Sequence, residues 1–122
     1  MVSLLRGVRG AITVEQNDHG TICESVVELL TEIVAANKIE TEDMGAVIFS
    51  STPDLNAAFP ALGARKMGWN EVPLFGTQEI DNPYGLPRCI RVLILWNTEL
   101  PQSAIKHIYL RDAVALRQDI KK

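Results

Sequence analysis

The stretch RCIRVLILW, residues 88–96, predicts a β-strand, because the run from Val92 to Trp96 is entirely apolar. Two arginines interrupt the pattern: Arg91 stands at the entrance of this strand and Arg88 directly before it. A guanidinium keeps its charge in proteins and is costly to bury without a partner. Spacing alone supports two interpretations of Arg91 equally, a partner for a carboxylate of the protein or a binding group for an anionic ligand.

Residues 4–15 show the alternation of a half-buried strand. The even positions carry apolar side chains such as Val8 and Ile12, whereas Arg9 lies on the odd face between small residues that leave room beside it. Further strands are predicted at residues 46–51, 72–77, 90–97 and 105–110.

Residues 21–36 predict one long helix, because apolar side chains recur at spacings of three and four. Thr21 and Glu24 have the spacing of a capping box at its start. A shorter helix is expected to begin near Pro60 and to end at Gly68. Strands mixed with one long helix and shorter ones indicate an α+β or mixed α/β sheet fold.

Composition describes one ordinary globular domain over residues 1–122, with 47% apolar and 22% charged residues. Twelve basic and fifteen acidic side chains give a net charge of -3, so the overall field does not attract nucleic acid or an anionic membrane. Any anion site must therefore be local. No signal peptide or membrane-spanning run is evident, and we expect a cytoplasmic protein.

The sequence lacks the motifs of metal sites, phosphate-binding loops and catalytic nucleophiles. Cys23 and Cys89 have no metal-ligand spacing and are expected to be reduced and buried. His19 fits a solvated or capping residue in a turn before the long helix, and His107 a structural histidine in a strand. There is no glycine-rich phosphate loop and no nucleophile elbow, so the residues do not predict a covalent or a metal mechanism. Residues 117–122 are expected to form a mobile tail.

Five segments, in order along nearly the whole chain, resemble the AroH-class chorismate mutases. They are RGVRGAITVE (6–15), SSTPDLNAAFPA (50–61), the QE of GTQEID (76–81), LPRCIRV (86–92) and IKHIYLRDAVALR (105–117). The resemblance implies a pseudo-α/β-barrel homotrimer with active sites at the subunit interfaces. It also implies an isomerase that converts chorismate to prephenate, toward phenylalanine and tyrosine, without metal, cofactor or covalent intermediate.

The resemblance assigns the catalytic roles to two residues. Arg91 matches the cation beside the ether oxygen of the substrate, and Glu79 matches the glutamate that accepts a hydrogen bond from the ring hydroxyl. Arg9 and Tyr109 match residues that bind a substrate carboxylate. Without the resemblance, Glu79 would be an ordinary solvated glutamate and Tyr109 a half-buried core aromatic.

Further positions match the walls of the family's pocket. Phe59 and Arg65 match residues supplied by a neighbouring subunit, and the backbone from Phe75 through Gly76 and Thr77 to Gln78 would line the same cleft. Leu116 and Arg117 match a C-terminal segment that closes over the ligand. Two positions depart from the family pattern: Leu62 stands where a lysine is expected, and Gly76 where a cysteine is common.

Two other functions remain compatible with these residues. A non-catalytic module that binds a small dicarboxylate would use the same arginines without chemistry. The trimeric imine and enamine deaminases resemble the predicted architecture in outline, but they do not require Glu79 and Arg91 to act as a pair.

Overall fold

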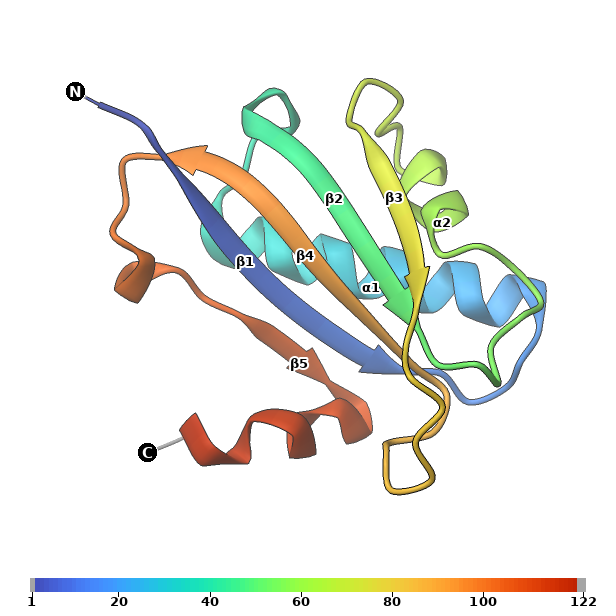
Figure 1. Ribbon diagram of the computed structural model, residues 1–122. Coiled ribbons are helices and arrows are strands. Elements are labelled where there is room, and N and C mark those ends of the chain that lie inside the picture. The colour runs from blue at the N-terminus through green and yellow to red at the C-terminus, as the bar shows by residue number, and fades with distance from the viewer. Residues whose placement is uncertain (1, 121–122) are drawn as a thin grey trace.

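The computed structural model describes residues 2–120, which form a five-stranded mixed sheet with two α-helices and three short 3-10 helices (Figure 1). The elements in chain order are β1 (Leu4–Thr13), α1 (His19–Asn37), η1 (Thr41–Asp43), β2 (Met44–Ser51), α2 (Ala61–Lys66), β3 (Leu74–Gln78), β4 (Cys89–Thr98), η2 (Gln102–Ala104), β5 (Ile108–Leu110) and η3 (Arg111–Ile120).

The strand order is β3-β2-β4-β1-β5, which puts β4 at the centre of the sheet. Both β1 and β2 pair with β4 in antiparallel fashion, whereas the outer pairs β2/β3 and β1/β5 are parallel. The predicted strand at residues 90–97 is therefore confirmed as the element that joins the two halves of the sheet. A mixed sheet with few helices matches the predicted fold class.

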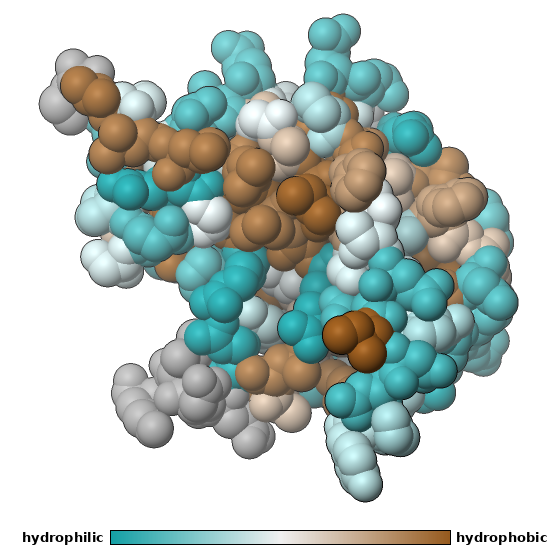
Figure 2. All heavy atoms as spheres, viewed as in Figure 1, coloured by the Kyte–Doolittle hydropathy of each residue, from teal (hydrophilic) through white to brown (hydrophobic). Residues whose placement is uncertain are grey.

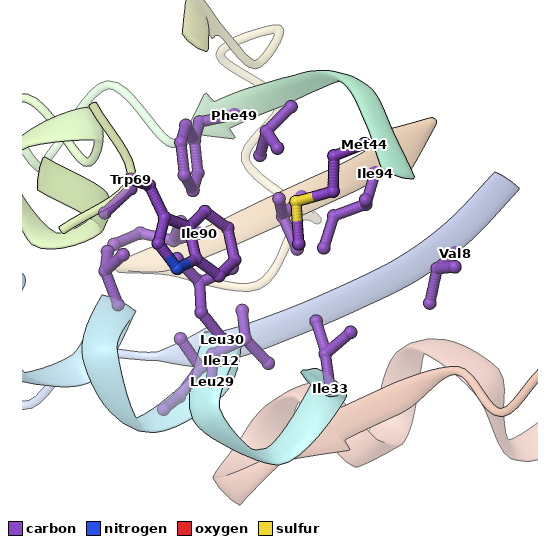
Figure 3. Close-up of a cluster of buried hydrophobic side chains, with 14 of the residues drawn as sticks. Val8, Ile12, Leu29, Leu30, Ile33, Met44, Phe49, Trp69, Ile90 and Ile94 are labelled. Carbon is purple, nitrogen blue, oxygen red and sulfur yellow. The ribbon is translucent and has the colours of Figure 1, made fainter. Parts of the chain in front are cut away.

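Helix α1 covers one face of the sheet, as seen behind the strands in Figure 1. Its side chains Leu29, Leu30 and Ile33 point toward the strands in Figure 3, and all three are fully buried. From the sheet, Ile12 and Ile90 meet them. Full burial of one such side chain stabilises the fold by roughly 1.5–3 kcal/mol. The predicted apolar faces of α1 and of β1 are thus confirmed.

The start of α1 differs from the prediction. The helix begins at His19, and Asp18 is its N-cap, with a carboxylate that accepts the backbone N–H of Gly20 at 3.1 Å. The hydroxyl of Thr21 donates to the same carboxylate instead of capping the helix itself. The predicted start at residue 21 and the placement of His19 in a turn before the helix are wrong, because an aspartate was available to cap one turn earlier.

Strand β5 is shorter than the predicted strand at residues 105–110. Before Ile108 the backbone makes hydrogen bonds with side chains and not with a neighbouring strand. The side-chain amide of Asn37 donates to the carbonyl of Lys106 and accepts its backbone N–H, at 2.9 Å each. The ring of His107 accepts the backbone N–H of Arg9. The chain continues as η3 to Ile120, so part of the tail predicted to be mobile is helical, while residues 121–122 lie outside the described residues.

Within residues 2–120, no α-helix covers the other face of the sheet, which is largely apolar. In Figure 2, which looks onto this face, hydrophobic side chains gather over the strands, and polar groups lie below them. The register pairs Phe75, Ile48 and Leu93 across three strands, so their side chains share this face. Phe75 is 63% exposed and Leu5 is 57% exposed. An apolar surface of this kind is typical of an interface.

Close packing of α1 against α2 depends on Gly63. A Cβ atom at that position would lie 2.7 Å from the Cβ of Val26, a contact too short for either helix to keep its position. We expect Gly63→Ala to lower the free energy of unfolding by about 1–3 kcal/mol, because an overpacked interface must separate. Urea denaturation at a fixed protein concentration measures this change.

The matched control is Gly20→Ala, since Gly20 also lies in a helix but would place its Cβ 3.6 Å from the nearest atom. There the same substitution should be neutral or stabilising by up to about 1 kcal/mol, because alanine favours helix. Equal effects of the two substitutions would contradict the packing argument.

Candidate active site

The sheet register places three polar side chains in one row on the open face. Arg91 on β4 pairs with Ser50 on β2 and with Ala11 on β1, and Ala11 in turn pairs with Tyr109 on β5. Paired residues in a sheet point to the same side. Ala11 is fully buried, in a small apolar cluster against which Tyr109 and Leu116 pack.

This row belongs to a pocket of about 330 Å³ on the open face. Six of the residues predicted from the sequence line it: Arg9, Glu79, Arg91, Tyr109, Leu116 and Arg117. They come from β1, β4, β5, η3 and the segment just after β3, which are distant in sequence. The structure thus brings the predicted catalytic pair and the predicted carboxylate-binding residues into one cavity.

Arg91 and Glu79 face each other at the wall of this pocket. The Nε of Arg91 lies 3.5 Å from a carboxylate oxygen of Glu79, and the two side chains are 52% and 27% exposed. The backbone N–H of Glu79 donates to the carbonyl of Ser51 at 2.9 Å, which extends the β2/β3 pairing by one residue. The interpretation of Arg91 as the partner of a protein carboxylate is therefore correct in part, and the exposure leaves the guanidinium accessible to a ligand as well.

The opposite end of the pocket is positively charged. Arg9 lies on the exposed face of β1, and the guanidinium of Arg117 lies 5.9 Å from the centre of the Tyr109 ring. Burial lowers the pKa of His107, and the charges of Arg9 and Arg117 lower it further. His107 is thus a neutral structural residue whose Nδ1 accepts the backbone N–H of Arg9 at 2.9 Å.

A second pocket, of about 800 Å³, lies near α2 and β3. Four further predicted residues line it: Phe59, Gly76, Thr77 and Gln78. Leu62, one of the departures from the family pattern, lines it too. Arg65 on α2 and Phe75 on β3 line neither pocket. Ten of the twelve predicted site residues therefore line one or the other of two pockets in one copy of the chain.

Sequence reasoning missed the floor of the first pocket. Ser50, Ile48 and Leu93 line it, and none of them stands out by residue type. The signal was the odd-even alternation on β2 and β4, which assigns all three to the face away from α1. The alternation identifies these residues as neighbours of Arg91 only when the alignment of β2 against β4 is known.

Arg111 anchors the segment that carries Leu116 and Arg117, a role that the sequence did not reveal. Its guanidinium donates to the carbonyl of Thr13 at 3.0 Å and to the hydroxyl of Ser25 at 3.2 Å, and it pairs with Glu28 at 2.5 Å. The backbone of Arg111 is left-handed, with a φ of 56°. The turn between β5 and η3 is thereby fastened to β1 and α1.

Both cysteines are free and buried, as predicted. Burial raises the pKa of the Cys89 thiol to about 11, with Glu79 and Asp54 adding to the shift and Arg91 opposing it. This thiol is therefore protonated at neutral pH. Among residues 2–120, no three histidine, cysteine or acidic side chains are grouped so that they could hold a metal ion. No helix in the same range is long and apolar enough to cross a membrane.

Comparisons with known proteins all point to the same family. The family model for chorismate mutase type I matches residues 5–120. The chain is 49% identical to chorismate mutase AroH of Thermus thermophilus, over 97% of this chain and 98% of that protein. It is 42% identical to chorismate mutase AroH of Bacillus subtilis, over 96% and 93%. A solved chorismate mutase from Clostridium thermocellum superposes with a TM-score of 0.88 at 42% identity, covering 89% of this chain and 97% of that one.

The His107 contact predicts how stability depends on pH. Its pKa is lowered from about 6.5 in the folded protein, so below that pH the unfolded chain binds more protons than the folded one. The stability that depends on neutral His107 is complete above about pH 6.5 and is lost as pH falls through the lowered pKa. His107→Gln cannot titrate and keeps an acceptor, so it should flatten this dependence.

Thermal unfolding of both proteins between about pH 7.5 and pH 5 measures the effect. The wild type should lose more of its melting temperature on acidification than His107→Gln does. Parallel curves for the two proteins would show that His107 does not couple protonation to folding.

Proposed function

This chain belongs to the chorismate mutase type I family, and we propose how its own side chains perform the reaction. The protein is an isomerase that converts chorismate to prephenate, a step toward phenylalanine and tyrosine. The comparisons favour this activity over the dicarboxylate-binding module and the deaminases, because each relative named above is a chorismate mutase. The observation that carries the assignment of residues is the convergence of Arg9, Glu79, Arg91 and Tyr109 on one pocket.

The reaction is a Claisen rearrangement within one molecule. The ether C–O bond of chorismate breaks while a C–C bond forms between the side chain and the ring, and no atom leaves. As the ether bond breaks, its oxygen gains negative charge. A fixed cation beside that oxygen stabilises the transition state more than the ground state, which accelerates the reaction.

Arg91 is the cation that we assign to the ether oxygen. It stands on the central strand, and the antiparallel partners on both sides fix its backbone. Glu79 faces the Nε of this guanidinium, so the N–H donors on its two terminal nitrogens remain for the substrate. Such a preorganised donor needs little reorganisation when charge develops in the transition state.

Glu79 accepts a hydrogen bond from the ring hydroxyl and lies near the positive charge that develops on the ring. Both roles place this carboxylate at the wall of the pocket, where its oxygen lies 3.5 Å from the Nε of Arg91. The pair therefore places opposite charges where the two halves of the substrate separate.

Substrate binding relies on the positive end of the pocket. Arg9 and Tyr109 bind one carboxylate of chorismate, and Arg117 and Leu116 close over the ligand. Three arginines and one glutamate line the pocket, and a lining in which cationic side chains outnumber anionic ones suits a substrate that carries two carboxylates. This match of charge explains how a protein with a net charge of -3 can attract a dianion locally.

We also propose that the protein is a homotrimer and that the second pocket completes the site of a neighbouring copy. Phe59, Arg65 and the segment from Phe75 to Gln78 would then supply the missing wall. Support comes from the apolar open face of the sheet, because Ile48 and Leu93 on that face also line the first pocket. A copy that covers this face would close the pocket at the same time.

The two departures from the family pattern lie in this second cluster. Leu62 provides no charge, and the Cα of Gly76 has open space beside it, since a Cβ there would meet nothing within 4 Å. Neither position supplies the charges that face the breaking bond. We expect them to change substrate affinity and not the type of reaction.

Replacement of Arg91 tests the proposed electrostatic role. Arg91→Lys keeps the charge but loses the planar fork and shortens its reach, so we expect kcat to fall by at least ~10²-fold. Loss of chorismate ultraviolet absorbance, with prephenate identified as product, measures this rate. The control is Arg6→Lys, since Arg6 bonds the carbonyl of Leu100 outside both pockets and should leave the rate unchanged. A fully active Arg91→Lys enzyme would remove Arg91 from the mechanism.

Mixing two inactive variants tests whether neighbouring copies share a site. Arg91→Ala disables the first pocket, and Phe59→Asp disables the wall that a neighbour would supply. If both are unfolded and refolded together, about a quarter of the interfaces combine an intact Arg91 with an intact Phe59, so about a quarter of the activity should return. A mixture that forms trimers and stays inactive would mean that each site is built from a single copy.

A further inference from the structure

The segment STPD, residues 51–54, begins with the last residue of β2 and belongs to a stretch that resembles the family. The side chains of Thr52 and Asp54 in it have had no role in the site so far. The carboxylate of Asp54 accepts the backbone N–H of Arg88 with both oxygens, at 3.0 and 3.2 Å. One of these oxygens also accepts the hydroxyl of Thr52 at 2.5 Å. Asp54 therefore joins the loop after β2 to the residue that precedes β4.

Thr52 continues this connection to the first residue of β4. Its hydroxyl oxygen accepts the backbone N–H of Cys89 at 3.0 Å, and its own backbone N–H donates to the carbonyl of Cys89 at 3.0 Å. The backbone N–H groups of both Arg88 and Cys89 are thus held by side chains from one short loop.

Arg88 itself adopts a conformation that requires support. Its φ is +46°, in the left-handed region that side chains with a Cβ seldom occupy. From the opposite side, the carbonyl of Arg88 accepts the N–H of Val14 at 2.8 Å, and its Nε donates to the carbonyl of Val14 at 3.0 Å. The turn into β4 is therefore clamped between the end of β1 and the loop that carries Asp54.

The end of β2, just before this loop, also contacts the backbone of the proposed catalytic pair. Ser50 pairs with Arg91, and the carbonyl of Ser51 accepts the N–H of Glu79. One continuous segment, residues 50–54, thus contacts the backbone of both charged residues and the turn three residues before Arg91. Small displacements in this segment would change the distance between the guanidinium and the carboxylate.

We propose that Asp54 is a positioning residue for catalysis, which holds the turn into β4 so that Arg91 faces the breaking bond. Asp54 and Thr52 do not line the pocket that contains Arg9. They line an adjacent pocket of about 430 Å³ that shares Glu79 and Arg91 as a wall. Asp54 reaches the strand of Arg91 through the backbone, by its contacts with Arg88 and, through Thr52, with Cys89. This inference rests on the roles proposed above for Arg91 and Glu79.

Two substitutions of Asp54 separate positioning from charge. Asp54→Asn keeps an oxygen that can accept from both Thr52 and Arg88, so its kcat should stay within about threefold of the wild type. Asp54→Ala removes the acceptor, and misplacement of the cation should lower kcat by about 10–100-fold with a smaller change in KM. A purely structural role would lower the melting temperature of Asp54→Ala and leave the kcat of the folded enzyme unchanged.

A second pair of variants keeps the proposal testable if Asp54→Ala does not fold. Thr52→Val removes the hydroxyl that links Asp54 to Cys89, whereas Thr52→Ser retains it, so only the valine variant should lose kcat. Asp43→Ala is the control, because Asp43 is an exposed aspartate just before β2, at the other end of the same strand. Its kcat should equal that of the wild type.

The Nε–H resonance of Arg91 in ¹H–¹⁵N spectra gives a readout that does not depend on turnover. It is identified by its loss in Arg91→Lys, and it should shift or broaden in Asp54→Ala but not in Asp54→Asn or Asp43→Ala. An unchanged resonance together with an unchanged kcat in Asp54→Ala would overturn the proposal. If Arg91→Lys were fully active, the role of Arg91 would fail, while the resonance would still report whether Asp54 orients it.

Discussion

The charge of Arg91, held on the open face of the central strand, is the constraint on which the rest of the structure depends. One side of β4 packs its apolar residues against α1, and the other side presents a guanidinium that cannot be buried alone. The core under α1 makes the strand rigid, and its two antiparallel neighbours fix the register. A cation on such a platform has a defined position before any substrate arrives, which is what electrostatic catalysis requires.

Much of this architecture follows from local patterns. Alternation on β1 and the periodicity of α1 predict which faces are buried, because burial of apolar side chains dominates those elements. The exact start of α1 and the length of β5 do not follow, because single polar side chains decide them: Asp18 caps one turn early, and Asn37 replaces ladder bonds beside Lys106. Such contacts depend on neighbours that only the folded chain brings together.

The candidate site shows the same division. The position of Arg91 at the entrance of an apolar strand was unusual, but the resemblance to a family was needed to connect it with Glu79 and Tyr109. The structure then adds what neither supplies: the row formed by Ser50, Arg91 and Tyr109, and the separation of the predicted residues into two pockets. Pairing across strands is nonlocal, so no window of sequence contains it. The proposed second copy would cover the apolar open face and add a wall to the first pocket.

The most direct test of this account is a crystal structure of the protein with prephenate bound. In the product, the former ether oxygen is the keto oxygen of the pyruvyl group. The account predicts that the guanidinium of Arg91 donates to that oxygen, that Arg9 and Tyr109 bind a carboxylate, and that Phe59 of a neighbouring copy closes the pocket. Prephenate bound with Arg91 directed only at Glu79, or enclosed by one copy alone, would contradict it.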